Sequence, residues 1–287
     1  MQWRCRDRTF DLSDRALVMG VLNLTPDSFS DGGRLLDPAR ALEHARGLIA
    51  EGADLVDLGA ESTRPGARPV PAAEQLRRLL PVLEPLCRET AACVSVDTAS
   101  GEVAARALAA GAHAVNDVTA LADPALAAAV AGAGAGLVLM HLRGTPATMQ
   151  EEPRYDDVTR EVRDWLAGRL ERARRAGIAE ECVALDPGIG FGKTVRHNLE
   201  LLSRLEELTV LGRPVMVGVS RKSFIGNLLD LPVDRRLEGS LGAAAIAVFT
   251  GARIVRAHDV AATVRAVRVA TALSAARRAS GEAVKRG

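Results

Sequence analysis

Aromatic residues are scarce in this chain: they make up 3% of its 287 residues, whereas hydrophobic residues together make up 48%. A sizeable core can form, but its side chains must be mainly aliphatic. Cysteine is also sparse, and the four thiols at positions 5, 87, 93 and 182 include no Cys-x-x-Cys pair and no clustered histidine partners. This spacing argues against a zinc or redox site, and we expect free thiols in a reducing compartment.

The chain lacks an excess of either charge, since 37 basic and 36 acidic residues leave a formal net charge of +1. Net charge thus gives no reason to expect nucleic acid or a membrane surface as a partner. The longest apolar run, residues 125–140, contains three glycines and is shorter than the roughly 20 residues of a membrane-spanning helix. The charged stretch MQWRCRDRTFDLSDR has no apolar signal segment. We expect a cytoplasmic protein.

Short apolar runs alternate with longer segments of helical periodicity. The runs predict strands at 17–22, 54–58, 93–96, 114–118, 136–140, 183–185, 214–219 and 253–255. The other segments predict helices near 38–51, 73–90, 101–110, 124–132, 157–176, 196–207, 235–250 and 259–279. Continuous Val, Leu and Ile runs are typical of parallel strands buried on both faces. Eight strand–helix units in a chain of this length favour a (β/α)8 TIM barrel over a doubly wound sheet.

No Pro/Ser/Gly-rich linker divides the chain, so we expect one domain. Residues 1–16 predict a short N-terminal hairpin with a turn near Arg6, residues 17–280 the barrel, and residues 281–287 a disordered tail. The segments 23–37, 59–72 and 142–156 are long connections, and such loops in a compact domain are usually functional.

Polar residues follow all eight predicted strands. In a TIM barrel the carboxyl ends of the strands meet at one face, so these residues would lie together. They are Asn23; Glu61, Ser62, Thr63 and Arg64; Asp97; Asn116 and Asp117; His141; Asp186 of DPGIGFGKT; Ser220, Lys222 and Ser223; and Arg256, His258 and Asp259. Singly each has a structural explanation, such as capping a helix or a turn. Eight together favour a functional site.

These residues fall into two chemical groups. Arg64, Lys222, Arg256 and His258 are cationic, whereas Asp97, Asn116 and Asp186 are acceptors. Guanidinium groups suit phosphate oxygens, and Asn23 offers a neutral oxygen ligand for Mg²⁺. Carboxylates suit the N–H donors of a heterocycle. The pattern predicts a substrate with an amino-heterocycle at one end and phosphates at the other.

Two glycine-rich segments imitate nucleotide-binding motifs. GIGFGKT is not a P-loop, because Pro187 stands where the Walker pattern needs glycine. Residues 131–136 precede a strand instead of following one, which excludes a dinucleotide-binding turn. We expect these glycines to serve tight turns.

Eight motifs, in this order and spacing, resemble the dihydropteroate synthase family of folate biosynthesis: MGVLNLTPDSFSDGG, GAESTRPGA, VDT, NDV, LMHLRGTPATMQ, DPGIGFGKT, VGVSRKSFIG and RIVRAHDV. The resemblance covers about residues 17–260. It implies a transferase that joins 6-hydroxymethyl-7,8-dihydropterin pyrophosphate to para-aminobenzoate and releases pyrophosphate and 7,8-dihydropteroate.

The resemblance also implies a role for each matching residue. The pterin would be held by Asp97, Asn116, Asp186 and Lys222, and the pyrophosphate and Mg²⁺ by Asn23, Thr63, Arg64, Arg256 and His258. The aminobenzoate pocket would be formed by Thr63, Pro65, Phe191, Lys222 and Ser223. Catalysis would depend on Arg64, Asp97, Asp186, Lys222, Arg256 and His258 through electrostatics and positioning, with no essential general base, because an arylamine is already nucleophilic at neutral pH.

Further expectations come with the family. It is commonly homodimeric, and the absence of an insertion after DPGIGFGKT indicates sensitivity to sulfonamides. Residues 25–33 are expected to be a lid that orders over bound ligand. Two other functions stay open at this point: a pterin-binding methyl-transfer domain acting with a corrinoid, in which Arg256 and His258 would have no anion to bind, and a pterin-binding homologue without catalysis.

Overall fold

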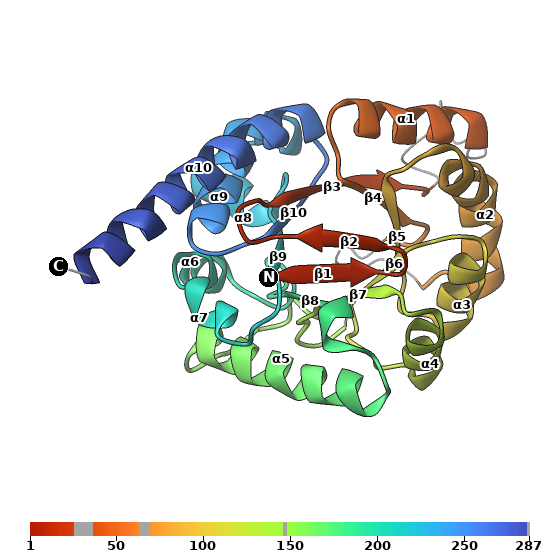
Figure 1. The fold of residues 1–287 in the computed structure, drawn as a ribbon, viewed down its shortest axis with the longest axis horizontal. Helices are drawn as coiled ribbons and strands as arrows, with labels where there is room; N and C mark the ends of the chain where they lie inside the picture. The colour runs from red at the N-terminus through yellow and green to blue at the C-terminus, as the bar shows by residue number, and fades with distance from the viewer. Residues whose placement is uncertain (26–36, 63–68, 146–147, 286–287) are drawn as a thin grey trace.

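The computed structural model describes residues 1–25, 37–62, 69–145 and 148–285. Its main sheet is an eight-stranded parallel barrel ringed by helices, with the strand order β8-β7-β6-β5-β4-β3-β10-β9 (Figure 1). A bridge between Leu185 and Val215 joins the two ends of this order and closes the ring. The predicted (β/α)8 TIM barrel is confirmed.

Each barrel strand is short and apolar. The strands are β3 (Leu17–Asn23), β4 (Leu55–Gly59), β5 (Cys93–Asp97), β6 (Ala114–Asp117), β7 (Gly136–Met140), β8 (Val183–Asp186), β9 (Met216–Gly218) and β10 (Ile254–Ala257). All residues of β4, β6, β7 and β8 are buried, because one face lines the barrel and the other lies under helices. Each barrel strand is joined to the next by a segment that contains a helix, because parallel neighbours need a crossover connection.

The helices begin where polar side chains cap their first turns. Asp37, Ser100, Asp123, Asp157 and Thr194 each accept a hydrogen bond from a backbone N–H of the helix that follows. The helices are α1 (Pro38–Ala50), α2 (Ala72–Glu89), α3 (Gly101–Ala109), α4 (Pro124–Ala133), α5 (Val158–Arg175), α6 (Val195–Ser203), α7 (Glu206–Thr209), α8 (Ser223–Leu229), α9 (Leu237–Phe249) and α10 (Val260–Lys285), with 3₁₀ turns η1 (Glu180–Cys182) and η2 (Val233–Arg235). No described helix has the length and apolar character needed to cross a bilayer.

Two helical predictions need correction. The segment 196–207 is two helices, α6 and α7, and 235–250 begins with η2 before α9 starts at Leu237. Helix α10 runs to Lys285, into the segment predicted to be a tail, and residues 286 and 287 lie outside the described residues.

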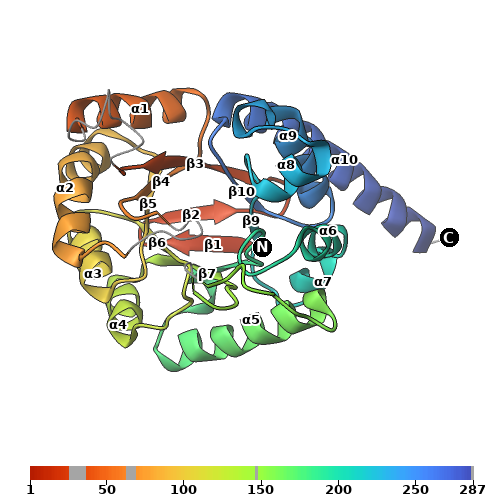
Figure 2. The same ribbon diagram turned by 180° about the vertical axis from the view of Figure 1, so that it is seen from behind.

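An N-terminal hairpin covers the amino end of the barrel. Strands β1 (Gln2–Cys5) and β2 (Arg8–Asp11) pair antiparallel through a turn at Arg6, as the sequence predicts. The hairpin crosses the centre of the ring of helices in both views (Figures 1 and 2). Its inward side chains Trp3, Cys5 and Leu12 are completely buried. The Trp3 indole Nε1–H donates to the Cys182 carbonyl oxygen over 2.9 Å, which ties the hairpin to the start of β8.

Side chains that point into the barrel lie in layers. The layer beside the hairpin is apolar and consists of Leu17, Met19, Leu55, Cys93, Ala114, Val138, Ala184, Met216 and Ile254. Since side chains alternate along a strand, the next inward layer is two residues further on. In that layer five strands carry the polar residues Asp57, Ser95, Asn116, Asp186 and Arg256, and β3, β7 and β9 carry Val21, Met140 and Gly218. Over two residues, the inward side chain of these five strands therefore changes from an apolar core residue to a polar residue that can bind a ligand.

Candidate active site

The register of four neighbouring strands brings the predicted residues into one row. Asn23 of β3 lies opposite Gly59 of β4, Gly59 opposite Asp97 of β5, and Asp97 opposite Asn116 of β6. A side chain at position 59 would fill the space between its neighbours, because an added Cβ would lie 3.5 Å from Asn23 Oδ1 and 3.7 Å from Asp97 Cβ. Glycine thus leaves room at the mouth of the barrel, between the predicted metal ligand and the predicted pterin ligand.

Arg256 is the centre of the polar layer. Its Nε donates to Asp57 Oδ2 over 2.7 Å and its terminal nitrogen donates to Asp97 Oδ2 over 3.0 Å. Burial works against the charged guanidinium, but the two carboxylates outweigh burial and raise the pKa of Arg256. The side chain is 21% exposed, so it is anchored from below and still accessible to a ligand. Cationic and acidic residues are therefore interlocked here, whereas the sequence suggests two separate groups.

Asp57 is a site residue that sequence reasoning misses. It lies in the middle of β4, in the apolar run LVDLG, and its side chain is completely buried. By its apolar neighbours this run has the character of strand core, and the polar residues that mark the site in the sequence lie beyond strand ends. The available signal is the carboxylate itself, because a charged group in a strand buried on both faces needs a charged or hydrogen-bonding partner.

The carboxyl group of Asp97 has a pKa well above its usual range. Burial raises the pKa of its carboxyl group to about 7, the charge of Arg256 opposes that rise, and the nearby carboxylates Asp57, Asp117 and Glu61 add to it. A carboxyl group with a pKa near neutrality changes charge in the physiological range. The side chain is 11% exposed at the end of β5, where a ligand entering the barrel would meet it.

Asn116 of β6 and Asp186 of β8 supply acceptors from strands that are separated by β7. Asn116 Nδ2 donates to Asp57 Oδ2 over 3.1 Å, and its Oδ1 is buried without a partner among the residues that the structure describes. Asp186 Oδ1 accepts the Gly188 backbone N–H over 2.7 Å. Burial raises the pKa of Asp186, and Lys222 opposes that rise. Each residue keeps an oxygen for a ligand.

Lys222 lies between the polar layer and the loop after β8. Its Nζ donates to the Ile189 carbonyl and lies 4.4 Å from the centre of the Phe191 ring. Burial lowers the pKa of Lys222 to about 8, although the charge of Asp186 opposes this shift. A cation over an aromatic face is attracted to the ring. Phe191 and Lys222, predicted from distant motifs, are thus brought into contact.

The loop after β8 is organised by a second lysine. Lys193 is buried, and its Nζ donates to the carbonyls of Gly188 and Phe191, both over 3.0 Å, and lies 2.9 Å from His141 Nδ1. Burial lowers the pKa of His141 to about 2, with Lys193 adding to the shift, so its imidazole is neutral at pH 7. His141 therefore serves the loop, as does Lys193, and both help to place Phe191.

Of the remaining predicted site residues, two have a described position and three do not. His258 follows β10, and its backbone N–H and Nδ1 lie 3.2 and 3.1 Å from Ser220 Oγ. Ser223 is exposed at the first position of α8. Thr63, Arg64 and Pro65 lie outside the described residues, as do residues 26–33 of the expected lid.

Three polar residues that follow strands are used for structure. Asp117 accepts the Leu121 backbone N–H over 2.6 Å, Glu61 accepts the Val70 N–H over 2.8 Å, and Asp259 accepts from Arg221 Nε over 2.9 Å. These contacts hold turns and loop ends around the site. Not every polar strand end is therefore available to a ligand.

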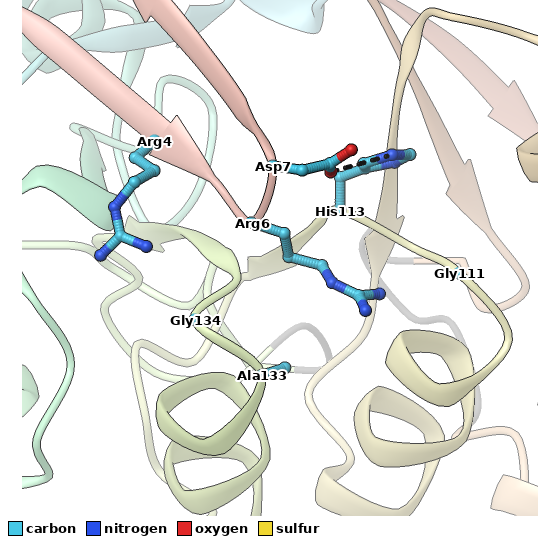
Figure 3. A pocket seen from close by; sticks show the side chains of 7 residues that line it. All are labelled: Arg4, Arg6, Asp7, Gly111, His113, Ala133 and Gly134. Carbon is cyan, nitrogen blue, oxygen red and sulfur yellow. Dashed lines mark ion pairs between the residues drawn. The ribbon is translucent and has the colours of Figure 1, made fainter.

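A hollow at the other end of the barrel is a weaker candidate. It measures about 450 Å³ and is lined by Arg4, Arg6, Asp7 and His113 beside the hairpin turn (Figure 3). Its charges already have partners: Arg4 pairs with Glu181, Arg6 donates to two backbone carbonyls, and Asp7 lies 3.8 Å from His113 Nε2. Conserved chemistry in a TIM barrel lies at the opposite face, and this end serves stability.

Comparison with known proteins agrees with the geometry. The pattern of the pterin binding enzyme family matches residues 19–258 of the chain. The chain belongs to this family. Dihydropteroate synthase of Escherichia coli (strain K12) is 47% identical over 260 residues, which cover 91% of this chain and 92% of that protein. Both the resemblance found in the motifs and the expected class of enzyme are confirmed.

Solved structures of pterin-binding enzymes share the fold. Yersinia pestis dihydropteroate synthase with a sulfonamide drug complex superposes with a TM-score of 0.90 at 44% identity, covering 95% of this chain and 98% of that one. Xanthomonas albilineans dihydropteroate synthase with 4-aminobenzoic acid gives a TM-score of 0.89 at 46% identity, with coverages of 96% and 98%. The similarity therefore extends over the whole barrel.

Proposed function

We propose that this pterin-binding enzyme condenses 6-hydroxymethyl-7,8-dihydropterin pyrophosphate with para-aminobenzoate, releasing pyrophosphate and 7,8-dihydropteroate. The observation that carries the proposal is the partly exposed guanidinium of Arg256, held by Asp57 and Asp97 beside the acceptors Asn116 and Asp186. The mouth of the barrel thus offers a cation for a leaving anion and acceptors for a heterocycle. The relatives named above carry the same activity in their names.

The pterin occupies the acceptor-rich interior. Asp97, Asn116 and Asp186 accept its ring and amino N–H groups, and Lys222 donates to its oxygen. Charge-assisted hydrogen bonds of this kind are stronger than neutral ones and fix the orientation of the ring. The raised pKa of Asp186 and of Asp97 reflects the cost of burying these carboxylates, and the N–H donors of a bound pterin offset that cost.

The pyrophosphate lies at the mouth of the barrel, against Arg256 and His258, with Thr63 and Arg64 in support. Cleavage of the C–O bond at the pterin methylene leaves negative charge on the pyrophosphate and positive charge on the carbon. The guanidinium stabilises the first and the carboxylate of Asp97 the second. Since Arg256 is held from below by Asp57, it needs little reorganisation during the reaction.

Magnesium is the proposed cofactor at the same mouth. Within residues 1–25, 37–62, 69–145 and 148–285, no cluster of three His, Cys, Asp or Glu residues is arranged to hold a metal ion. Asn23 at the end of β3 would supply one oxygen ligand, which fits Mg²⁺ because that ion commonly takes few protein ligands and completes its shell with phosphates and water. When bound, Mg²⁺ neutralises charge on the leaving pyrophosphate.

Para-aminobenzoate lies against Phe191 and Lys222, near Ser223, and its walls include Thr63 and Pro65. The neutral amine attacks the pterin methylene carbon, forms the C–N bond and then releases a proton to solvent. No side chain is required as a general base. Sulfonamides imitate the aminobenzoate, so we propose that they compete for this pocket.

The decisive experiment incubates the purified protein with the pterin pyrophosphate, para-aminobenzoate and Mg²⁺ and measures pyrophosphate and dihydropteroate. Stoichiometric release of both products is expected, with inhibition by a sulfonamide that is relieved by excess para-aminobenzoate. Pterin binding without turnover would instead identify a non-catalytic homologue. Methyl transfer to a corrinoid without pyrophosphate release would identify the methyl-transfer alternative.

A homodimer and a cytoplasmic location complete the proposal. The adjacent helices α9 and α10 expose Ile246, Phe249, Val269 and Leu273, with exposed fractions of 56%, 36%, 62% and 57%. Four free cysteines suit a reducing compartment. Sedimentation equilibrium should give a dimer that Val269→Glu dissociates. Val210→Glu is the control for adding a charge at an exposed apolar side chain, because Val210 is 72% exposed after α7 and is not one of the four residues; a monomeric wild-type protein would contradict the proposal.

A further inference from the structure

Asp57 has a distinctive place beneath the candidate active site. Its completely buried carboxylate uses one oxygen, Oδ2, for two partners: Arg256 Nε at 2.7 Å and Asn116 Nδ2 at 3.1 Å. Asp57 therefore connects Arg256, which is proposed to bind pyrophosphate, with Asn116, which is proposed to bind the pterin. Asp57 lies two residues before Gly59 on β4, opposite Ser95, and Ser95 lies two residues before Asp97 on β5.

The partners of Asp57 determine the orientation of the Asn116 amide. A guanidinium can only donate, so Oδ2 of Asp57 is an acceptor toward Arg256 and toward its second partner as well. Of the two ends of an amide, only the NH₂ group can donate to that oxygen. The carbonyl oxygen of Asn116 must consequently point the other way. This assignment follows from the hydrogen-bond network, which is how amide orientations are decided.

The Asn116 oxygen that is turned away from Asp57 lacks a hydrogen-bond donor among the described residues, which costs free energy. Asn116 Oδ1 is buried, and no atom of the described residues donates to it. Buried acceptors in native proteins nearly always have a partner, so an orphaned one next to a binding cavity indicates a donor supplied by the ligand. A ring nitrogen that carries a hydrogen fits this position, whereas a ring nitrogen with a lone pair would meet the carbonyl oxygen with repulsion.

We propose that Asp57 is a positioning residue that locks the Asn116 amide with its oxygen toward the bound pterin, so that the site selects a heterocycle with an N–H at this point. The inference rests on the proposed function. It assigns to Asp57 a role in selecting the ligand, in addition to its ion pair with Arg256.

The test measures binding of 6-hydroxymethyl-7,8-dihydropterin by calorimetry. This probe lacks the pyrophosphate, so effects of Asp57 that pass through Arg256 and a leaving anion are reduced. Asp57→Ala frees the Asn116 amide to rotate, and we expect the Kd to rise about tenfold, the size of one lost well-placed hydrogen bond. Asp57→Asn should stay within about threefold of wild type, because Arg256 still forces an amide oxygen into the place of Oδ2.

Two further variants separate positioning from a merely structural role. In an Asn116→Ala background, the additional Asp57→Ala change should alter the Kd by less than about twofold, since the residue through which Asp57 acts has gone. Ser95→Ala removes another buried polar group from the same layer, and we expect an unchanged Kd. An equal loss from Asp57→Ala in both backgrounds, or an equal loss in Asp57→Asn and Asp57→Ala, would overturn the proposal.

A neutron structure of the wild-type protein with the same pterin gives an answer even if Asp57→Ala does not fold. The amide deuterons of Asn116 should lie toward Asp57, and a ring N–D of the pterin should point at Asn116 Oδ1. Amide deuterons that point at the pterin would refute the inference while leaving the proposed function intact. A wild-type protein that does not bind the pterin would refute both.

Discussion

The two ends of this barrel are built from the same strands and do opposite things. At the amino end, Leu55, Cys93 and Ala114 pack under the hairpin with Trp3 above them. Two residues further along the same strands, Asp57, Ser95 and Asn116 form a layer in which three polar atoms are buried without a partner in the described part of the chain. At the amino end apolar side chains pack against one another, whereas at the carboxyl end buried polar atoms lack protein partners among the described residues.

This contrast indicates how the fold supports its site. Unpartnered polar groups and closely spaced carboxylates destabilise a folded chain, so a compensating source of stability must lie elsewhere. The hairpin supplies it by sealing the amino end without reaching the site. Changes at one end should therefore alter stability alone, and changes at the other should alter activity more than stability.

Trp3→Ala should give the largest change in stability. Removing a fully buried indole leaves a cavity and deletes the bond to Cys182, and we expect a loss of about 3–5 kcal/mol in the free energy of unfolding, measured with urea. Turnover per folded molecule should remain close to wild type. Trp3→Phe is the graded control, because it loses the hydrogen bond and keeps most of the apolar contact. A folded Trp3→Ala protein with strongly reduced kcat would show that the two ends are coupled.

Arg256→Ala should give the largest change in activity. It deletes the cation proposed to stabilise the leaving pyrophosphate, and losses of about 100- to 1000-fold in kcat/KM are typical for such a group. Arg4→Ala is the matched control at the amino end, where Arg4 forms an exposed ion pair with Glu181. We expect that variant to keep its activity and to lose at most about 1 kcal/mol of stability. Equal effects from the two substitutions would break the distinction between the ends.

The sequence identifies site residues that lie at or beyond the end of a strand, and it does not identify a site residue in the middle of a strand. The alternation of apolar runs and helical segments predicts the barrel and the hairpin, because local periodicity determines them. Asn23, Asp97 and Arg256 are found because they terminate runs. Asp57 is missed, since its ion pair with Arg256 joins β4 to β10, two strands that are far apart in sequence and separated by β3 in the sheet, and has no local signature.

Loop contacts are a second class that sequence cannot supply. Lys193 is conspicuous in a chain poor in lysine, yet its bonds to Gly188 and Phe191 depend on the left-handed backbone at Gly188, where φ is 67°. At the break between α6 and α7, Arg204 ends α6 and its side chain donates to Asp157 and Glu207. Such features depend on tertiary contacts, which outweigh local propensity.

Gly136→Ala should sharpen the description of the amino end. A Cβ at this position would lie 2.4 Å from Cys5 Sγ, so the hairpin would have to shift. We expect a loss of about 1–3 kcal/mol in unfolding free energy, as for other overpacked cores. Gly132→Ala is the control: it lies in α4 with open space around it, and should stabilise the helix by up to about 1 kcal/mol. A destabilised Gly132→Ala protein, or an unaffected Gly136→Ala protein, would contradict this packing.

The smallest effect should be a dependence on pH at the carboxyl end. The pKa of Asp97 is raised from 3.8 to about 7, chiefly by burial, so the folded protein holds a proton there that the unfolded chain releases near pH 4. This group therefore opposes folding progressively as pH rises through that window. Pterin binding should show the reverse trend, because the proposed hydrogen bond to the ring needs the ionised carboxylate.

Between about pH 6 and pH 7.5, the ionised fraction of a group with this pKa rises from about a tenth to about three quarters. Affinity for 6-hydroxymethyl-7,8-dihydropterin should rise roughly eightfold over this interval, measured by calorimetry in buffers of constant ionic strength. Asp97→Asn should bind more weakly and show a flat profile over the same range. A profile that persists in Asp97→Asn would move the titrating group elsewhere, and a flat wild-type profile would remove Asp97 from pterin binding.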